Sequence, residues 1–132
     1  MVSNLGRVKL FAELPDSEMK TISRQLREIK HAPGKEIMIR GEGGAGFMVI
    51  LDGEAEVEMP NGRSRTLRPG DHFGEMALLD HEGRSANVRA RTELTVGAIP
   101  EWEFKTFLRD HPEISFRLLQ TLSRRLRDAE AG

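Results

Sequence analysis

Residues 73–79 read Phe-Gly-Glu-Met-Ala-Leu-Leu, and residues 84–90 read Arg-Ser-Ala-Asn-Val-Arg-Ala, with a polar loop between them. Gly74 allows the backbone to approach a ligand closely. A short helical turn over the apolar residues leaves free N–H groups and a partial positive charge, which suit an anion. Arg84 adds a planar, permanently charged donor and Ser85 adds a hydroxyl group. This stretch therefore predicts a small binding site for a phosphate.

Glu75 fits such a site only if the ligand also carries hydroxyl groups. A carboxylate repels a phosphate, but it accepts hydrogen bonds from a sugar diol. A phosphate together with sugar hydroxyl groups points to a nucleotide. The alternative is a helical turn with a surface ion pair between Glu75 and Arg84, which leaves the neighbouring Gly74, Ala77 and Ser85 unexplained.

The two halves of the stretch, F-G-E-x-A-L-L and R-S-A-x-V-R-A, resemble the phosphate-binding cassette of cyclic nucleotide-binding domains. That family includes catabolite activator protein, kinase regulatory subunits and cyclic-nucleotide-gated channels. The resemblance implies that Arg84, Ser85 and the backbone at Gly74 and Ala77 surround the cyclic phosphate. It also implies that Glu75 accepts a hydrogen bond from the ribose 2′-hydroxyl. The expected function is that of a regulatory sensor domain, with no enzymatic activity, no metal and no cofactor beyond the bound nucleotide.

Recognition of the base is expected to depend on residues that precede the cassette. Val57 and Leu67 are the best candidates by position to line the base pocket. Arg65 resembles an arginine of cyclic-GMP-dependent kinases that reaches the guanine oxygen, although it also fits an exposed strand arginine. Ser85 stands where those kinases use threonine, and catabolite activator protein has serine there and uses cyclic AMP. The resemblance of R-S-A-x-V-R-A to the bacterial factors favours cyclic AMP, with cyclic GMP as the alternative ligand.

Length and composition restrict the class of protein. A chain of 132 residues fits one domain with its own core, and the absence of cysteine excludes disulfides and fits a cytoplasmic location. Lys and Arg number 20 against 21 Asp and Glu, so we expect no long-range attraction to DNA or to an acidic membrane. The longest apolar runs, 47–51 and 76–79, are far shorter than the roughly twenty residues that span a bilayer. Direct nucleic-acid binding and membrane insertion are therefore not expected.

The single domain over residues 1–132 divides into three predicted parts. Residues 1–30 carry a helical periodicity, with a second helix capped by Asp16 or Ser17. Residues 31–100, which include the cassette at 73–86, alternate turn signals with β-like segments at 36–39, 47–51, 54–59, 63–67, 85–91 and 94–99. Residues 101–130 hold helices in which Trp102 and the nearby phenylalanines are expected to pack in the core. The pattern predicts a mainly β domain, an antiparallel jelly-roll barrel with flanking helices.

The last helix has more apolar residues than one packing face needs, namely Ile114, Phe116, Leu118, Leu119, Leu122 and Leu126. Part of this stripe must seal the barrel, and the remainder would mark a surface for an effector domain or a partner protein. The heptads of a strong coiled coil are lacking, so we expect a monomer or a weak homodimer. We further expect this helix, hinged after Pro112, to relay ligand occupancy. The basic end at Arg124, Arg125 and Arg127 is interpreted as a solvated complement of the helix dipole.

Two other classes of protein compete with the sensor domain. The sequence Pro-Gly-Asp-His at 69–72 could belong to a cupin, a jelly-roll metal enzyme. A metal site needs several ligands that converge on one face, whereas the histidines are scattered singly, at His31, His72, His81 and His111. The second alternative is an interaction module that has lost its ligand, against which the intact cassette argues.

Overall fold

The computed structural model describes residues 5–38, 46–59, 61–74 and 86–131 of the chain. Two short helices come first, η1 (Lys9–Phe11) and α2 (Asp16–Gln25), and α4 (Glu101–Asp110) and α5 (Pro112–Ala131) come last. The strands between them are β1 (Arg27–His31), β2 (Glu36–Met38), β3 (Phe47–Asp52), β4 (Ala55–Glu58), β5 (Ser64–Leu67), β6 (His72–Phe73), β7 (Asn87–Ala90) and β8 (Leu94–Ile99). Helices therefore flank a run of strands on both sides, as predicted.

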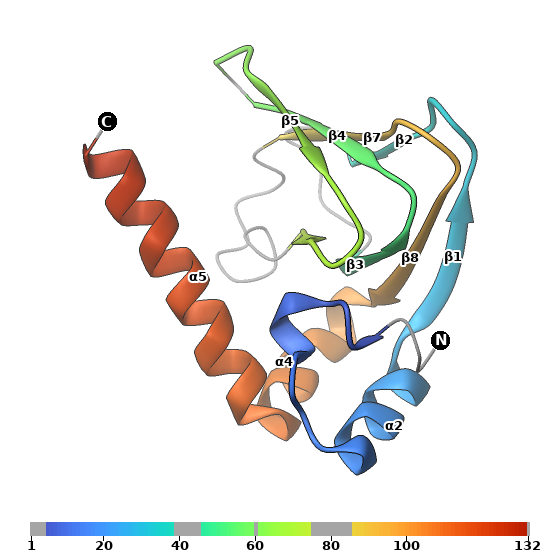
Figure 1. The fold of residues 1–132 in the computed structure, drawn as a ribbon, viewed down its shortest axis with the longest axis vertical. Coiled ribbons are helices and arrows are strands. Elements are labelled where there is room, and N and C mark those ends of the chain that lie inside the picture. Colours follow the sequence, from blue (N-terminus) through green and yellow to red (C-terminus); the bar gives the residue numbers. More distant parts are fainter. Residues whose placement is uncertain (1–4, 39–45, 60, 75–85, 132) are drawn as a thin grey trace.

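The strands form two four-stranded antiparallel sheets, with the orders β1-β8-β3-β6 and β2-β7-β4-β5. Strands that follow each other in sequence often lie in different sheets, which is the connectivity of a rolled-up barrel rather than of a simple meander. Figure 1 shows the two sheets facing each other, with α2, η1 and α4 gathered at one end of them. The predicted jelly-roll fold with flanking helices is confirmed.

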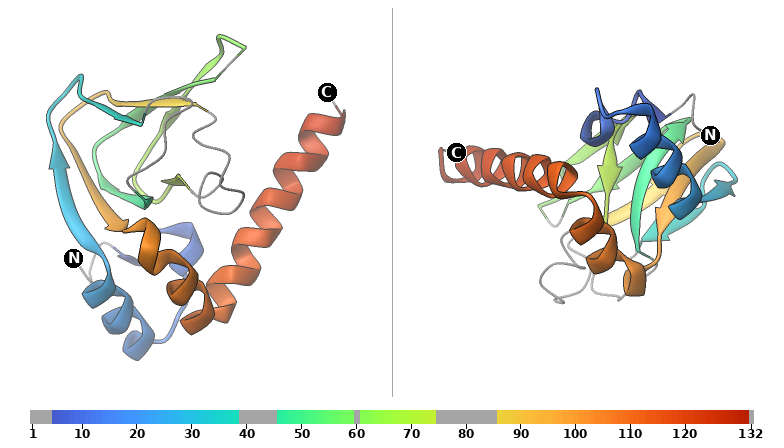
Figure 2. Two further views of the ribbon diagram at one scale, coloured as in Figure 1. Left: turned by 180° about the vertical axis from the view of Figure 1, so that it is seen from behind. Right: turned by 90° about the horizontal axis from the view of Figure 1, so that it is seen from below.

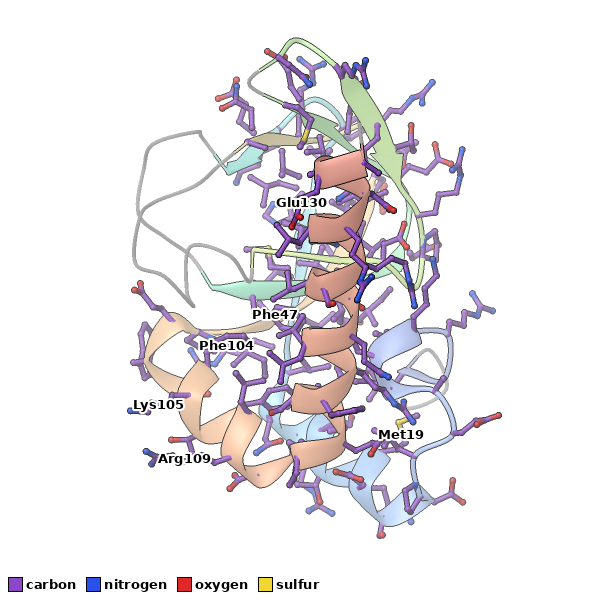
Figure 3. The ribbon with its side chains drawn as sticks, turned by 90° about the vertical axis from the view of Figure 1, so that its left-hand side faces the viewer. Met19, Phe47, Phe104, Lys105, Arg109 and Glu130 are labelled. Carbon is purple, nitrogen blue, oxygen red and sulfur yellow. The ribbon has the colours of Figure 1, made fainter. Side chains whose placement is uncertain are left out.

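Strand β3 separates two hydrophobic cores. All of its residues from 47 to 51 are buried. Phe47, Val49 and Leu51 belong to the cluster shared with the helices, whereas Met48 and Ile50 belong to the cluster between the sheets. A strand covered on both faces has a continuous apolar sequence, which explains the run at 47–51. Figure 3 shows Phe47 beside Phe104 of α4, and their ring centroids lie 5.3 Å apart.

His111 joins the helical segments at the start of α5. Its ring is almost completely buried, at 2% exposure. Nδ1 lies 2.7 Å from a carboxylate oxygen of Glu18, and Nε2 lies 2.8 Å from the amide oxygen of Gln25. Both partners belong to α2, so the residue between α4 and α5 is fixed to the N-terminal helix. The start of α5 is therefore fixed in position relative to α2.

Beyond that point α5 leaves the helical end and extends along one side of the barrel (Figures 1 and 2). Ile114 and Leu118 are buried, whereas Phe116, Leu119 and Leu126 are exposed. The exposed fractions of these three side chains are 56%, 64% and 60%. The expectation that part of the apolar stripe stays uncovered in a single copy of the chain is confirmed.

Three local predictions are wrong. Trp102 is 75% exposed and lies outside the core, whereas Phe104 and Phe107 of the same helix are buried in it. The Trp102 ring packs against Arg27, whose guanidinium carbon lies 5.8 Å from the ring centroid. β1 begins at Arg27, inside the segment expected to be helical up to residue 30. The N-cap of α2 is Pro15, with no side-chain cap, so Asp16 lies in the first turn, where its charge still suits the helix dipole.

Candidate functional site

The stretch that carries the predicted cassette begins on one sheet and ends on the other. β6 precedes it and pairs with β3 through Met48↔Phe73 and Val49↔His72. β7 follows it and pairs with β2 and with β4 of the opposite sheet. Residues 73 and 87, on either side of the predicted phosphate ligands, are thus held by different sheets. A ligand bound to this segment would contact the part of the chain that joins the two halves of the barrel.

Most of the predicted phosphate and ribose contacts lie outside the described residues. These are Glu75, Ala77, Arg84 and Ser85. Gly74 is described, and its φ of 95° lies in the left-handed region, which glycine adopts without the strain that a side chain would cause. The backbone conformation at the start of the cassette therefore favours a glycine.

The predicted base pocket forms one wall of the barrel interior. Val57 and Leu67 are buried, at 5% and 3% exposure. In the β4–β5 pair, Ala55 lies opposite Leu67 and Val57 lies opposite Arg65. Side chains at alternate positions of a strand share a face, so Arg65 is on the same face as Leu67. The structure thus brings Val57, Leu67 and Arg65 together, with the exposed Arg65 at the rim.

The same wall continues towards the end of the cassette. Val57 lies opposite Val88 of β7, three residues after Ser85. Val88 is buried and belongs to the same cluster as Val57 and Leu67. The chain that follows the predicted phosphate ligands is therefore hydrogen-bonded next to the predicted base wall. The strand that follows the predicted cassette and the predicted base wall thus lie side by side.

A cavity of about 440 Å³ opens beside this wall, between β5, η1 and α5. Leu67 and His72 contribute to its lining from the barrel. The charged side chains that line it are Lys9, Arg65, Asp71, Arg117, Arg124 and Arg125. Sequence reasoning assigned Arg124 and Arg125 to a solvated helix end and placed no residue of α5 beside this wall. A usable signal was present, because Arg117, Gln120, Thr121 and Arg124 recur at spacings of three and four and form a polar face of the helix.

Hydrogen bonds fix two sides of this cavity. The Lys9 ammonium lies 3.1 Å from Oδ1 of Asp71, and the other oxygen of Asp71 accepts a 2.8 Å hydrogen bond from the backbone N–H of Arg68. Arg117 Nη1 donates to the carbonyl oxygens of Leu10 and Ala12, at 3.1 and 2.6 Å. η1 is therefore held both to the turn before β6 and to α5.

Gly70 allows η1 to approach that turn. Its φ is 100°, and a Cβ at this position would collide with the carbonyl oxygen of Arg7. The backbone N–H of Lys9 donates to the carbonyl oxygen of Gly70 at 3.2 Å. Since Gly70 is four residues before Gly74, η1 is attached close to the strand that enters the cassette.

Other sites receive little support from the described residues. In that part of the chain no group of three or more His, Asp or Glu residues lies close enough together to hold a metal ion. No helix in the described ranges is long and apolar enough to cross a membrane. Desolvation, together with the charge of Lys35, lowers the pKa of the His31 imidazole. It lies at the end of β1, paired with Leu94 of β8.

Two antiparallel sheets, an apolar wall between them and strands that flank the predicted cassette on either side define a barrel domain. The family model described as the cyclic nucleotide-binding domain matches residues 28–111. The chain belongs to this family.

Relatives and solved structures agree with the assignment. The chain is similar to a CRP-like cAMP-activated global transcriptional regulator of Mycobacterium tuberculosis, with 29% identity over 93% of this chain and 57% of the regulator. It is 37% identical to a cAMP-dependent protein kinase regulatory subunit of Emericella nidulans over 79% of this chain and 26% of that subunit. The Thermus thermophilus catabolite activator protein superposes with a TM-score of 0.83 at 29% identity, covering 92% of this chain and 60% of that one. The chain thus spans only part of the length of each of these proteins.

Proposed function

We propose that this domain is a sensor that binds a cyclic nucleotide, cyclic AMP in preference to cyclic GMP, and does not transform it. The observation that carries the proposal is the family match over residues 28–111, which includes both the cassette and the wall of the barrel. Cyclic AMP is favoured because both the mycobacterial regulator and the fungal kinase subunit are named for it. The matched relatives are a transcriptional regulator and a regulatory subunit, which supports a role without catalysis.

The proposed ligand lies between the cassette and the β4–β5 wall. Arg84 and Ser85 bind the cyclic phosphate, and the backbone at Gly74 and Ala77 completes its shell. Glu75 accepts a hydrogen bond from the ribose 2′-hydroxyl. These roles rest on the resemblance of the cassette to the family's and on the positive φ of Gly74, which suits a backbone that approaches a phosphate.

The base is proposed to lie on Val57 and Leu67, with Arg65 at the rim. A guanine base presents two acceptors on its O6/N7 edge, which an arginine can bind with two hydrogen bonds. An adenine presents a donor beside N7 and gains less from the same side chain. Arg65→Ala should therefore weaken cyclic GMP binding and leave cyclic AMP nearly unchanged. Equal losses for the two nucleotides would show that Arg65 acts through its charge alone.

We propose that α5 transmits the ligand-bound state of the domain to an effector domain or a partner protein. The exposed side chains of Phe116, Leu119 and Leu126 support this role, because an uncovered apolar strip on a helix is a surface for protein contact. The chain itself is proposed to act as a monomer or weak homodimer in the cytoplasm, without touching nucleic acid. Its near-neutral charge, with 20 basic against 21 acidic residues, fits the last point.

A thermal-shift series separates the proposal from its two alternatives. The protein is melted alone and with cyclic AMP, cyclic GMP, AMP or divalent metal ions. Ligand at about 100 times its dissociation constant should add about 2.7 kcal/mol of stability, so cyclic AMP should raise the melting temperature clearly. A shift with metal ions only would favour a cupin-like enzyme. No shift with any of these ligands would favour an interaction module that has lost its ligand.

A further inference from the structure

Helix α4 turns one face to the core and the opposite face to solvent. Phe104 and Phe107 are buried, at 3% and 2% exposure. At about 100° per residue, Trp102 and Arg109 lie on the other side of the helix, with Lys105 beside them. All three side chains are exposed, Trp102 at 75%. Figure 3 shows Lys105 and Arg109 pointing away from the body of the molecule. We call Trp102, Lys105 and Arg109 the α4 face.

The tryptophan of the α4 face is held by a residue of another element. The guanidinium carbon of Arg27, the first residue of β1, lies 5.8 Å from the Trp102 ring centroid. Arg27 is itself fixed, because its Nη2 donates a 3.1 Å hydrogen bond to Oε1 of Glu103. These contacts restrict the orientation of the ring, and a partner that binds a preorganised side chain loses less conformational entropy. Trp102 is therefore an exposed aromatic side chain that is prepared for contact.

The two cations of the α4 face have no anionic partner within the described part of the chain. Neither Lys105 nor Arg109 makes a hydrogen bond or an ion pair there. They are four residues apart, and like charges at this spacing on a helix repel each other. Arg109 lies in the last turn, where its charge suits the helix dipole, but Lys105 lies in the middle of α4 and gains little from the dipole. An anionic group bound between the two side chains would offset their repulsion.

We infer that the α4 face is a docking surface for an acidic segment of another protein. An apolar side chain of this segment packs on Trp102, and its carboxylates pair with Lys105 and Arg109. Trp and Arg are enriched among the residues that contribute most to protein interfaces. The exposed carboxylates of Glu101 and Asp110 stand at the two ends of α4 and repel a uniformly negative surface, such as an anionic membrane or a nucleic acid. A protein segment can place a neutral or basic residue opposite each carboxylate, so the charge pattern favours a protein partner.

This surface is separate from the two already described. The exposed apolar side chains of α5 belong to the next helix, and in Figure 3 Lys105 and Arg109 point away from α5. Among the described residues, none from α4 lines the cavity beside the base wall. The inference therefore does not rest on the proposed binding of a cyclic nucleotide, and variants of the α4 face should leave cyclic AMP binding unchanged.

Binding of short acidic peptides tests the inference. The probes are fluorescein-labelled peptides Glu-Asp-Glu-X-Glu-Asp-Glu with Leu or Phe at X, and basic counterparts with Lys at every charged position. Fluorescence anisotropy of the probes measures their affinity for the full chain at physiological ionic strength. Because Trp102 is the only tryptophan of the chain, a blue shift of its emission with the unlabelled peptide reports contact at the α4 face.

The acidic peptides should bind and the basic ones should not. Lys105→Glu together with Arg109→Glu should weaken the acidic peptides about tenfold or more and make the basic peptides the tighter ligands. Trp102→Ala should weaken the acidic peptides about fivefold or more. Lys20→Glu with Arg24→Glu is the matched control, since it makes the same charge change at the same spacing on α2, which contains no aromatic residue. This control should change the affinity less than about twofold.

No binding of the acidic peptides up to about 1 mM would overturn the inference. Equal losses in the two double variants would also overturn it, because the attraction would then come from the overall charge. The same holds if Trp102→Ala binds the peptides like the wild type, or if phosphatidylserine vesicles bind the protein and the peptides do not. Circular dichroism checks that each variant is folded. None of these outcomes depends on cyclic AMP, whose binding has its own tests.

Discussion

Glu75 carries a negative charge that opposes phosphate binding. Its presence in the cassette is favourable only if its carboxylate binds another part of the ligand. If it accepts a hydrogen bond from the ribose 2′-hydroxyl, the wild-type protein should bind cyclic AMP more tightly than its 2′-deoxy analogue. Glu75→Gln should reduce this preference, because an amide oxygen still accepts a hydrogen bond but lacks the charge. Competition binding of the two nucleotides measures the preference.

The control for this prediction is Glu56, which lies on β4 opposite Arg89 of β7. Its carboxylate is 3.9 Å from the Arg89 guanidinium in a partly exposed pair. Glu56→Gln should leave both affinities unchanged, because such pairs contribute little. Equal binding of the two nucleotides to the wild type would contradict the role of Glu75.

His31 makes a prediction about pH. Burial lowers the pKa of its imidazole, and the nearby Lys35 lowers it further. Between this pKa and the value of about 6.5 in the unfolded chain, the unfolded state binds more protons. The contribution of His31 to stability is therefore complete above about pH 6.5 and is lost as the pH falls through the folded-state pKa. Urea unfolding of the wild type and of His31→Gln at a series of pH values should show a smaller loss of stability towards acid in the variant. Parallel curves would contradict this account.

The burial of a side chain was predictable where a single sequence pattern determined which way it faces. The alternation of charged and apolar residues over 54–59 predicts that Ala55, Val57 and Met59 point inward; Ala55 and Val57 are buried, and Met59 is partly buried against the same cluster. Trp102 is two residues before Phe104 and five before Phe107, which at about 100° per residue puts it on the opposite side of α4 from both, so this spacing favours an exposed position. The cation–π contact with Arg27, 75 residues earlier, depends on how β1 and α4 lie in space. No local pattern contains that information.

Among the elements, η1 is attached to α5 chiefly by Arg117. Its guanidinium donates to the carbonyl oxygens of Leu10 and Ala12. Hydrogen bonds from a charged group to partly buried acceptors contribute about 1.5–3 kcal/mol, so Arg117→Ala should lower the free energy of unfolding by about 2 kcal/mol. Glu113→Ala removes the i,i+4 pair with the same arginine and one acidic residue of the first turn of α5, and should cost less than about 1 kcal/mol. Chemical denaturation compares the two variants, and equal costs would show that the contact with η1 is not stabilising.

The last helix provides a prediction about dynamics. If it relays occupancy, saturating cyclic AMP should slow amide hydrogen exchange over residues 112–129 as well as over 74–86. The physical reason is a population shift towards the state in which α5 is held against the barrel. Hydrogen exchange followed by mass spectrometry, with and without nucleotide, measures both segments. Slower amide exchange at 74–86 with no change at 112–129 would mean that the ligand binds but that α5 does not respond to it.

The elements themselves were predictable to different degrees. β8 agrees with the predicted segment 94–99, because an apolar run is bounded by turn residues and by Pro100. β1 was missed, because most of its side chains are exposed and its polar sequence gives no strand signal. β6 has only two residues, which is too short for any periodicity. These strands form because β1 pairs with β8 and β6 pairs with β3, and both partners are distant in sequence.

For the molecule as a whole, the central feature is a cassette that begins on one sheet and ends on the other. β6 pairs with β3, and β7 pairs with β4, so a ligand that orders the segment between them would also couple the two sheets. η1 extends this connection, since it contacts both the turn before β6 and α5. The turn before β6 is thus joined to α5 through η1, which is the route by which the proposed ligand would affect the last helix. The residues of the cassette predict a phosphate-bearing ligand and the resemblance narrows the prediction to a cyclic nucleotide, whereas these contacts required the structure.

The claim that depends most directly on this arrangement is that Arg84 binds the cyclic phosphate. Titration calorimetry of cyclic AMP with the wild type, Arg84→Ala and Arg89→Ala is the measurement that tests it. Removing one partner of a desolvated charge pair costs about 2–5 kcal/mol, so Arg84→Ala should weaken binding by roughly 30-fold or more. Arg89→Ala, which removes an exposed arginine of the same sequence motif, should change the affinity less than about twofold. A change of less than about threefold in Arg84→Ala, or an equal loss in both variants, would contradict the account.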